Sequence, residues 1–216
     1  MPDSARPLRA DAERNRKRII AAARRLFAER GLDVSLDDVA EEAGVGVGTV
    51  YRRFANRDDL VFGVFLDHLK TVAARVGEAL EEPDPWVGLV DLMGWVCQLM
   101  AEDRGLAAII MTIDHSNPEI QEVKSEMSDQ LARVFDRAMD AGALRPDLAV
   151  TDLYGLFTML TAVAEKTQPV APGTWRRYLG LVLDSISAEP ARTSLGAPPI
   201  SDEQFEQMRH HAHQNA

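Results

Sequence analysis

The sequence predicts an all-α protein with an N-terminal three-helix helix-turn-helix headpiece and a larger C-terminal helical domain. Apolar residues recur at intervals of three and four through most of the chain, as they do on one face of an α-helix. No segment shows the alternating apolar and polar residues of a half-buried β-strand. We therefore expect a headpiece at residues 11–57, a second helical domain at residues 58–188 and a flexible tail at residues 189–216.

The composition and charge are those of a soluble globular protein, with 46% hydrophobic and 27% charged residues in 216. A single cysteine excludes an intrachain disulfide, and no segment resembles a signal peptide or a membrane span, so we expect a cytoplasmic protein. The net charge is −10, but residues 1–57 carry 12 Lys and Arg against 9 Asp and Glu. This local basic excess is typical of a part that contacts nucleic-acid phosphates.

Residues 35–60 predict short helices in close succession. Ser35 and Asp38 have the spacing of a capping box, in which each side chain bonds the backbone of the other residue. Gly44 is expected to end this helix because glycine adopts the left-handed conformation without strain. Gly46 can cap the next helix, and such a short glycine-containing connection is typical of a helix-turn-helix.

The second of these helices, predicted at residues 47–54, has two distinct faces. Val47, Val50 and Phe54 share one side and are expected to pack inward. The outward side carries Gly48, Thr49, Arg52 and Arg53, with Tyr51 at the margin. Guanidinium groups can bind guanine edges, and hydroxyl groups can bind phosphate. The alternative is an ordinary surface helix with solvated arginines, but a glycine near its start favours close approach to DNA.

Three stretches resemble the TetR/AcrR family of transcriptional regulators: IIAAARRLFAERG at residues 19–31, AGVGVGTVYRRF at residues 43–54 and NRDDL at residues 56–60. The family usually has Thr where this chain has Ser35, Ser where it has Gly46 and Lys where it has Arg57. The resemblance implies a DNA-binding headpiece that contacts an operator through the following residues: Ser35, Gly48, Thr49, Tyr51, Arg52, Arg53 and Arg57. It also implies a homodimer, because the family pairs its last two large helices across a two-fold axis.

The remaining elements follow from caps and apolar periodicity. Residues 1–10 are either a frayed terminus or a basic arm for a DNA minor groove. Asp11 is the expected N-cap of the first helix, which ends at Arg30, and Asn56 caps a long helix that ends near Glu81. Further helices are predicted at residues 86–102, 105–114, 118–141, 149–166, 175–188 and 201–213. The broad apolar faces of the helices at 149–166 and 175–188 are either internal core or the dimer interface.

The second domain is rich in methionine and aromatic residues, which suits an apolar cavity for a small effector. The alternative is that these side chains fill gaps in an ordinary core. The candidate ligand-binding residues are Trp95, Met100, Met111, His115, Met127, Phe135 and Phe157.

Taken together with the resemblance, the sequence predicts a ligand-responsive repressor that leaves a palindromic operator when a small apolar effector binds. A regulator controlled by a metal or by a protein partner is one alternative, and an enzyme with a DNA-binding appendage is another. No hydrolase, nucleotide-binding or metalloprotease motif is present, so we expect neither an enzyme nor a cofactor. His210, His211 and His213 have no carboxylate or cysteine at ligand spacing, which favours a solvated tail over a metal site.

Overall fold

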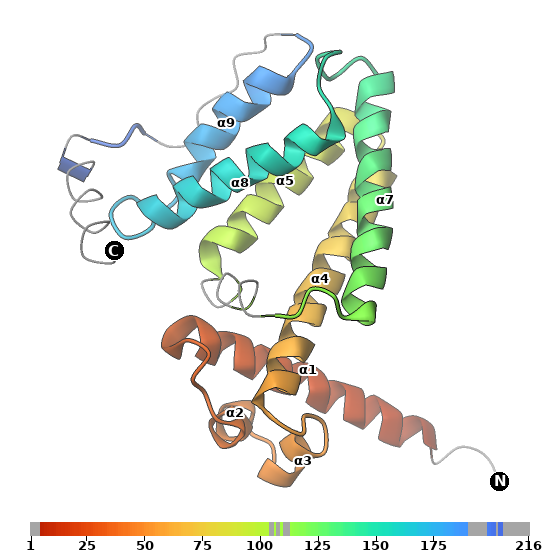
Figure 1. Cartoon of the computed structure of the whole chain (residues 1–216), viewed down its shortest axis with the longest axis vertical. Helices are drawn as coiled ribbons and strands as arrows, with labels where there is room; N and C mark the ends of the chain where they lie inside the picture. Colours follow the sequence, from red (N-terminus) through yellow and green to blue (C-terminus); the bar gives the residue numbers. More distant parts are fainter. Residues whose placement is uncertain are drawn as a thin grey trace. The chain divides into compact units, whose positions relative to one another are not determined.

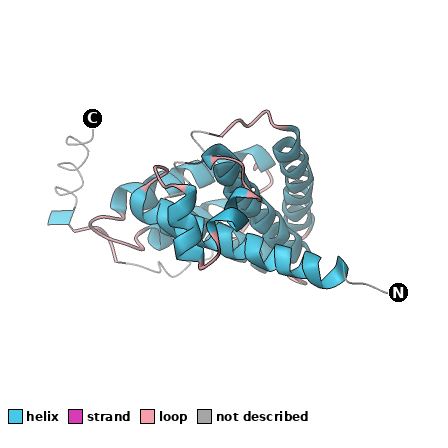
Figure 2. Ribbon diagram, turned by 90° about the horizontal axis from the view of Figure 1, so that it is seen from below, coloured by secondary structure: helices cyan, strands magenta, loops and turns pink. Residues whose placement is uncertain are grey.

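The computed structural model describes residues 5–103, 106, 109, 113–189, 198–201, 203 and 204, with side chains from residue 11 onward. All the regular elements in these residues are α-helices, and one isolated antiparallel β-bridge joins Leu144 to Ser187 (Figures 1 and 2). The all-α prediction is therefore confirmed. The predicted helices at residues 105–114 and 201–213 lie largely outside the described residues. None of the described helices is long and apolar enough to cross a membrane.

The chain divides into two compact units. The first unit comprises residues 1–71 and 103–123, and the second comprises residues 72–102 and 124–216. Two helices contribute residues to both units: α4 (Arg57–Glu81) and α7 (Pro118–Asp140). These units are defined by internal packing, and the functional boundaries expected at residues 57 and 188 stay predictions.

The first unit contains α1 (Ala5–Arg30), α2 (Leu36–Ala43), α3 (Val47–Tyr51) and the start of α4. In Figure 1 these helices run from red to orange, and α2 packs against both α1 and α3. Apolar residues at helical spacing on α1 form one buried stripe: Ile19, Ile20, Ala23, Leu26 and Phe27. Burying these apolar side chains removes them from water and holds the short helices α2 and α3, which are too short to be stable alone.

The first helix begins earlier than predicted. The sequence indicated Asp11 as its N-cap, but α1 already starts at Ala5. Asp11 instead pairs with Arg14 one turn later on the same helix. Pro7 does not prevent this extension, because the first turn of a helix has no internal partner for its backbone N–H groups.

The second unit contains α5 (Pro85–Glu102), α8 (Val150–Thr167), α9 (Trp175–Ile186) and the remainder of α4 and α7. Helix α8 contacts both α5 and α9. Their buried apolar side chains form one cluster that also includes Val76 of α4 and Phe135 of α7. Local capping explains the bounds of α7: Asn117 Oδ1 accepts a hydrogen bond from the Glu119 N–H at 2.9 Å, and Gly142 has a φ of 67° after the end of the helix.

Candidate nucleic-acid interface

The start of α2 is fixed by the predicted capping box. Ser35 Oγ accepts the Asp38 N–H at 3.1 Å, and Asp38 Oδ2 accepts the Ser35 N–H at 3.0 Å. Because the hydrogen bonds from Ser35 stabilise the ionised carboxylate, they lower the pKa of Asp38. Ser35, a predicted DNA contact, is exposed, but its hydroxyl is already engaged in this cap.

The end of α2 is held by a contact that the sequence did not reveal. Gly44 has a φ of 60° there, as predicted, and its N–H bonds back to the carbonyls of Ala40 and Glu41. The guanidinium of Arg18 on α1 donates to the carbonyls of Ala43 at 2.8 Å and Gly44 at 3.2 Å. A cation at this position satisfies carbonyls that have no partner within the helix. Arg18 therefore attaches α1 to the turn between α2 and α3.

Helix α3 is shorter than predicted and ends at Tyr51, although the chain continues through a tight turn to Phe54. Val50 and Phe54 are buried, in agreement with the prediction. Val47 was expected to be buried with them, but it is 45% exposed. Val47 is the first residue of this five-residue helix. Val50, near the end of the helix, is the residue of α3 that is buried.

The outward side of α3 and of the turn that follows it carries five of the residues predicted to contact DNA. Tyr51 is 50% exposed, Gly48, Arg52 and Arg53 are exposed, and Thr49 is half-buried. The Arg52 Nη2 donates to Thr49 Oγ1 at 3.1 Å, so the hydroxyl orients one of the two guanidinium groups. A Cβ at Gly48 would meet only Arg52 Nη1, at 4.0 Å. This face thus offers hydrogen-bond donors around a position where a partner can approach the backbone closely.

Arg57 lies at the start of α4 and is already paired. Its Nη1 donates to Asp33 Oδ1 at 2.7 Å, and both side chains are exposed. The predicted cap is also present, because Asn56 Oδ1 accepts the Asp59 N–H at 2.8 Å. Exposed ion pairs of this kind are weak, so Asp33 leaves Arg57 able to exchange its partner for a phosphate.

The predicted ligand-binding residues are distributed over both units. In the second unit, Phe135 is buried in the core, Met127 and Phe157 are partly buried against it, and Trp95 and Met100 are half-buried on α5. In the first unit, His115 makes an edge-to-face contact with Phe65, with ring centroids 5.7 Å apart. Met111 lies outside the described residues. The cavity between the start of α8 and the end of α9, and the groove that adjoins it, are lined by other residues.

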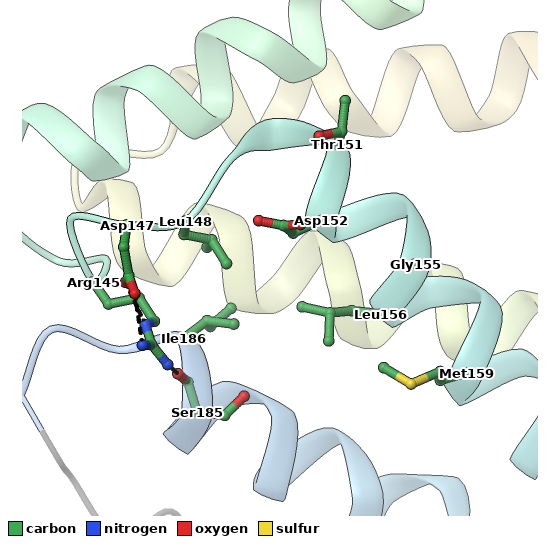
Figure 3. Close-up of a pocket in the computed structure, with 10 residues that line it drawn as sticks. All are labelled: Arg145, Asp147, Leu148, Thr151, Asp152, Gly155, Leu156, Met159, Ser185 and Ile186. Atoms are coloured by element: carbon green, nitrogen blue, oxygen red, sulfur yellow. Dashed lines mark hydrogen bonds and ion pairs between the residues drawn. The ribbon is translucent and has the colours of Figure 1, made fainter.

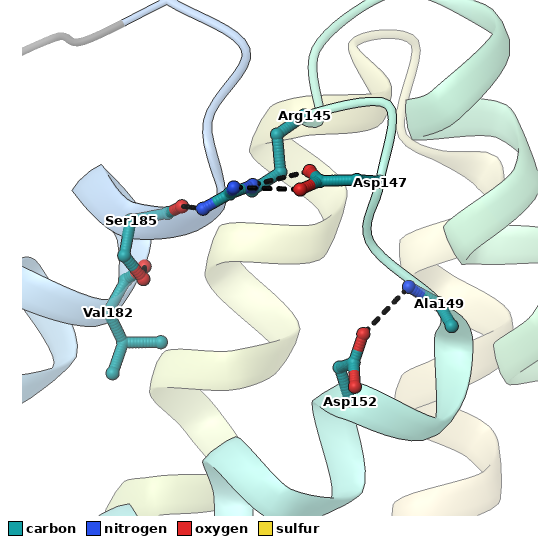
Figure 4. Close-up of polar contacts among 6 residues, drawn as sticks. All are labelled: Arg145, Asp147, Ala149, Asp152, Val182 and Ser185. Atoms are coloured by element: carbon teal, nitrogen blue, oxygen red, sulfur yellow. Dashed lines mark hydrogen bonds and ion pairs between the residues drawn. The ribbon is translucent and has the colours of Figure 1, made fainter.

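One cavity of about 490 Å³ lies in the second unit between the start of α8 and the end of α9 (Figure 3). Leu148, Leu156 and Ile186 supply its apolar side, and Arg145, Asp147 and Asp152 supply polar groups. Arg145 donates to both carboxylate oxygens of Asp147, at 2.6 and 2.9 Å, and to the Ser185 carbonyl at 3.4 Å (Figure 4). These bonds attach the segment before α8 to the end of α9.

An adjoining groove of about 340 Å³ continues along α8 and α9. It shares Leu156, Met159 and Ser185 with the first cavity. The other lining residues are Leu160, Val163, Tyr178, Leu181 and Val182. Large apolar side chains are exposed on these helices, including Tyr154 at 80% and Leu181 at 47%. A continuous apolar surface of this kind is typical of a protein–protein interface.

Comparison with known families agrees with this arrangement. A family described as bacterial regulatory proteins, tetR family, matches residues 19–64. A second family, described as the C-terminal domain of SbtR-like transcriptional regulators, matches residues 84–188. An HTH-type transcriptional regulator of Staphylococcus aureus strain USA300 is 37% identical over 73 residues, which are 30% of this chain and 40% of that protein. The match to this curated relative therefore spans less than half of its length.

Two solved structures resemble the whole fold. A TetR transcription regulatory protein from Mycobacterium vanbaalenii has 30% sequence identity and a TM-score of 0.67, and the match covers 84% of this chain and 99% of that one. A TetR transcriptional regulator from Streptomyces coelicolor has 28% identity and a TM-score of 0.62, with 80% and 98% coverage. The likeness therefore extends over both units.

Proposed function

The chain belongs to the tetR family of bacterial regulatory proteins, and from this premise we propose that it is a ligand-responsive repressor that binds operator DNA. The family consists of regulators, in agreement with the prediction that the chain is not an enzyme. The single observation that carries the proposal is the exposed face of α3. It presents Thr49, Tyr51 and the guanidinium groups of Arg52 and Arg53 around Gly48. The fold does not require glycine at this position, because a Cβ there would meet only the tip of Arg52.

The proposed DNA contacts fall into two kinds. Tyr51 at the end of α3 and Arg52 and Arg53 in the turn that follows it are exposed, and we propose that they contact base edges in the major groove. Ser35 and Arg57 lie at the starts of α2 and α4, where side chains and backbone N–H groups can bind phosphates. Gly48 permits close approach of the duplex, and Thr49 orients Arg52.

The protein would act as a homodimer that uses the apolar surface of α8 and α9. The support is the exposed apolar groove lined by Met159, Leu181 and their neighbours. Two identical headpieces would then read two half-sites about one helical turn of DNA apart, or a multiple of this distance. A two-fold dimer therefore implies a palindromic operator.

The effector would be a small apolar molecule bound by the second unit. The support is its adaptable core, where Met127, Phe135 and Phe157 pack with the buried Met93. Methionine side chains can rearrange around an irregular ligand. A metal-controlled regulator is less well supported, because no cluster of three potential metal ligands occurs among the described residues. His210, His211 and His213 of the predicted tail lie outside these residues.

The direct test is selection of duplex DNA from a random-sequence pool by the full-length protein, followed by fluorescence anisotropy titration at several salt concentrations. We expect a palindromic site whose binding weakens as salt rises, because bound phosphates release counterions. The double variant Thr49→Ala, Tyr51→Ala should lose this binding while remaining folded, since Tyr51 is exposed and Thr49 is only half-buried on α3.

Thr71→Ala on α4 is the control, because Thr71 is an exposed threonine whose hydroxyl bonds only its own helix at Asp67. It should bind as the wild type does. If no duplex is enriched, or if the double variant binds with unchanged affinity and salt dependence, the proposed role of α3 is wrong.

A further inference from the structure

A buried histidine and a carboxylate meet inside the first unit. His68 on α4 is 2% exposed, and its Nε2 lies 3.1 Å from Oδ2 of Asp103, the residue that follows α5. The contact lacks hydrogen-bond geometry, and neither ring nitrogen has a hydrogen-bond partner among the described residues. Nη2 of Arg24 on α1 lies 3.4 Å from the same carboxylate oxygen. One oxygen of Asp103 therefore contacts both α1 and α4.

The other oxygen of Asp103 has a different role. Oδ1 accepts the Leu106 N–H at 3.0 Å, so it caps the turn that begins at Asp103. Burial acts to raise the pKa of Asp103, but His68, the Leu106 N–H and Arg24 together lower it below its ordinary value. Asp103 is therefore a carboxylate at neutral pH, held between two helices and its own following turn.

The two helices that meet at Asp103 contact the segments on either side of α3: α1 before it, at Ala43, and α4 after it, at Phe54. Arg18 of α1 caps the end of α2, and α4 starts shortly after α3 in the chain. We infer that Asp103 is a positioning residue for DNA binding, which keeps α1 and α4 in the arrangement that presents the outward face of α3. This inference rests on the proposed function.

A purely structural ion pair is the simpler explanation, but the energetics do not favour it. The cost of removing charges from water offsets most of the attraction in a buried pair, and apolar residues of similar size often serve as well. Such locally unfavourable groups are expected where geometry matters to function.

The test uses full-length Asp103→Asn, which preserves the size of the side chain and removes its charge. The probe is the duplex that the wild type enriches from random-sequence DNA. We expect about tenfold weaker binding, which lies within the usual range of coupling between distant sites. This direction is informative, because removing a negative charge would otherwise strengthen attraction to DNA.

Glu102→Gln is the matched control, since it removes the same charge from the adjacent, exposed residue. It should bind at least as tightly as the wild type. A double-mutant cycle adds a second criterion. Measured against Lys17→Gln, which removes the same positive charge from an exposed residue of α1, Arg24→Gln should weaken binding of the wild type but not of Asp103→Asn, because both substitutions break one interaction.

Asp103→Asn that is folded and binds indistinguishably from Glu102→Gln would overturn the inference. If Asp103→Asn does not fold, Arg24→Gln decides instead, compared with Lys17→Gln, which removes the same positive charge from an exposed residue of α1. If no duplex is enriched, the proposed function fails, and hydrogen exchange of the free protein decides the positioning role. Faster exchange in α1, α2 and α3 of Asp103→Asn than of Glu102→Gln supports it, and equal exchange overturns it.

Discussion

The ring of Phe54 lies directly against the backbone of Gly63, and a Cβ at residue 63 would come within 2.7 Å of Phe54 Cε1. Phe54 ends the turn after α3, and Gly63 is buried in α4. This close approach places the end of the proposed DNA-contacting segment on the long helix. A glycine inside a helix costs conformational entropy, and here that cost permits the contact.

We predict that Gly63→Ala destabilises the protein by about 1–3 kcal/mol, because the added methyl group overpacks the contact with Phe54. Gly77→Ala is the control in the same helix. A Cβ at Gly77 meets nothing within 4 Å, so alanine should stabilise the helix by about 0.5–1 kcal/mol. Urea unfolding of both variants measures the two changes. Equal shifts in the same direction would contradict the role given to Phe54.

A different result is expected at Gly48. Its Cβ would meet only the tip of Arg52, so Gly48→Ala should leave α3 intact and stabilise it by about 0.5–1 kcal/mol. If DNA approaches the backbone here, the same methyl group should weaken operator binding. Thermal unfolding and anisotropy titration together separate the two effects. A variant that is more stable and binds as tightly as the wild type would show that Gly48 does not face the duplex.

The sequence predicted the local elements of the headpiece well because each depends on neighbouring residues. Ser35 and Asp38 cap one helix across three positions, and Gly44 ends it with a left-handed φ. The buried stripe of α1 likewise follows from helical periodicity, as Ile19 and Phe27 show. These signals act over one or two turns, so no long-range information was needed.

The contacts that the sequence did not reveal join residues far apart in the chain. Arg18 reaches the carbonyl of Ala43, and Arg24 reaches Asp103. Nothing in the neighbourhood of either arginine indicates its partner. Val47 shows a different difficulty: periodicity placed it on the buried face, but it is the first residue of a five-residue helix and is 45% exposed there.

Arg18→Gln tests the contact that holds the turn between α2 and α3. Losing a charged donor to two carbonyls should destabilise the protein by about 1 kcal/mol, since hydrogen bonds to charged groups exceed the ordinary value but the bond to Ala43 is only part-buried and the bond to Gly44 is exposed. Operator binding should fall as well, because the turn positions α3. Lys17→Gln removes the same charge from the preceding exposed residue, and it should affect stability less. A larger effect from Lys17→Gln would contradict the capping role.

The capping box of α2 predicts a pH-dependent contribution to stability. The pKa of Asp38 is lowered in the folded protein by its hydrogen bonds with Ser35, so the ionised form stabilises the fold. This contribution is present above the ordinary pKa of 3.8 and is lost as the pH falls through the lowered value. Asp38→Asn should therefore be less stable than the wild type at pH 7, with the difference shrinking at lower pH. Urea unfolding of both proteins from pH 7 to pH 3 measures it, and a difference that does not shrink as the pH falls would contradict the role given to the Asp38 carboxylate.

The exposed surface of α8 and α9 predicts the outcome of a charge substitution. Leu181 is 47% exposed and lines the apolar groove, so Leu181→Glu should leave the folded subunit intact. In a dimer, however, it would bury two carboxylates against an apolar partner surface, and such burial is unfavourable without pairing. Analytical ultracentrifugation at micromolar concentration should show a dimeric wild type and a monomeric Leu181→Glu.

Val87→Glu is the matched control for that experiment, because Val87 is an apolar residue on α5 that is 40% exposed and does not line the groove. It should remain dimeric. The monomeric variant should also lose most of its operator affinity, since each headpiece would bind one half-site without the effective concentration that dimerisation supplies. A Leu181→Glu protein that stays dimeric would place the interface elsewhere, and a monomeric one with full affinity would exclude a two-half-site operator.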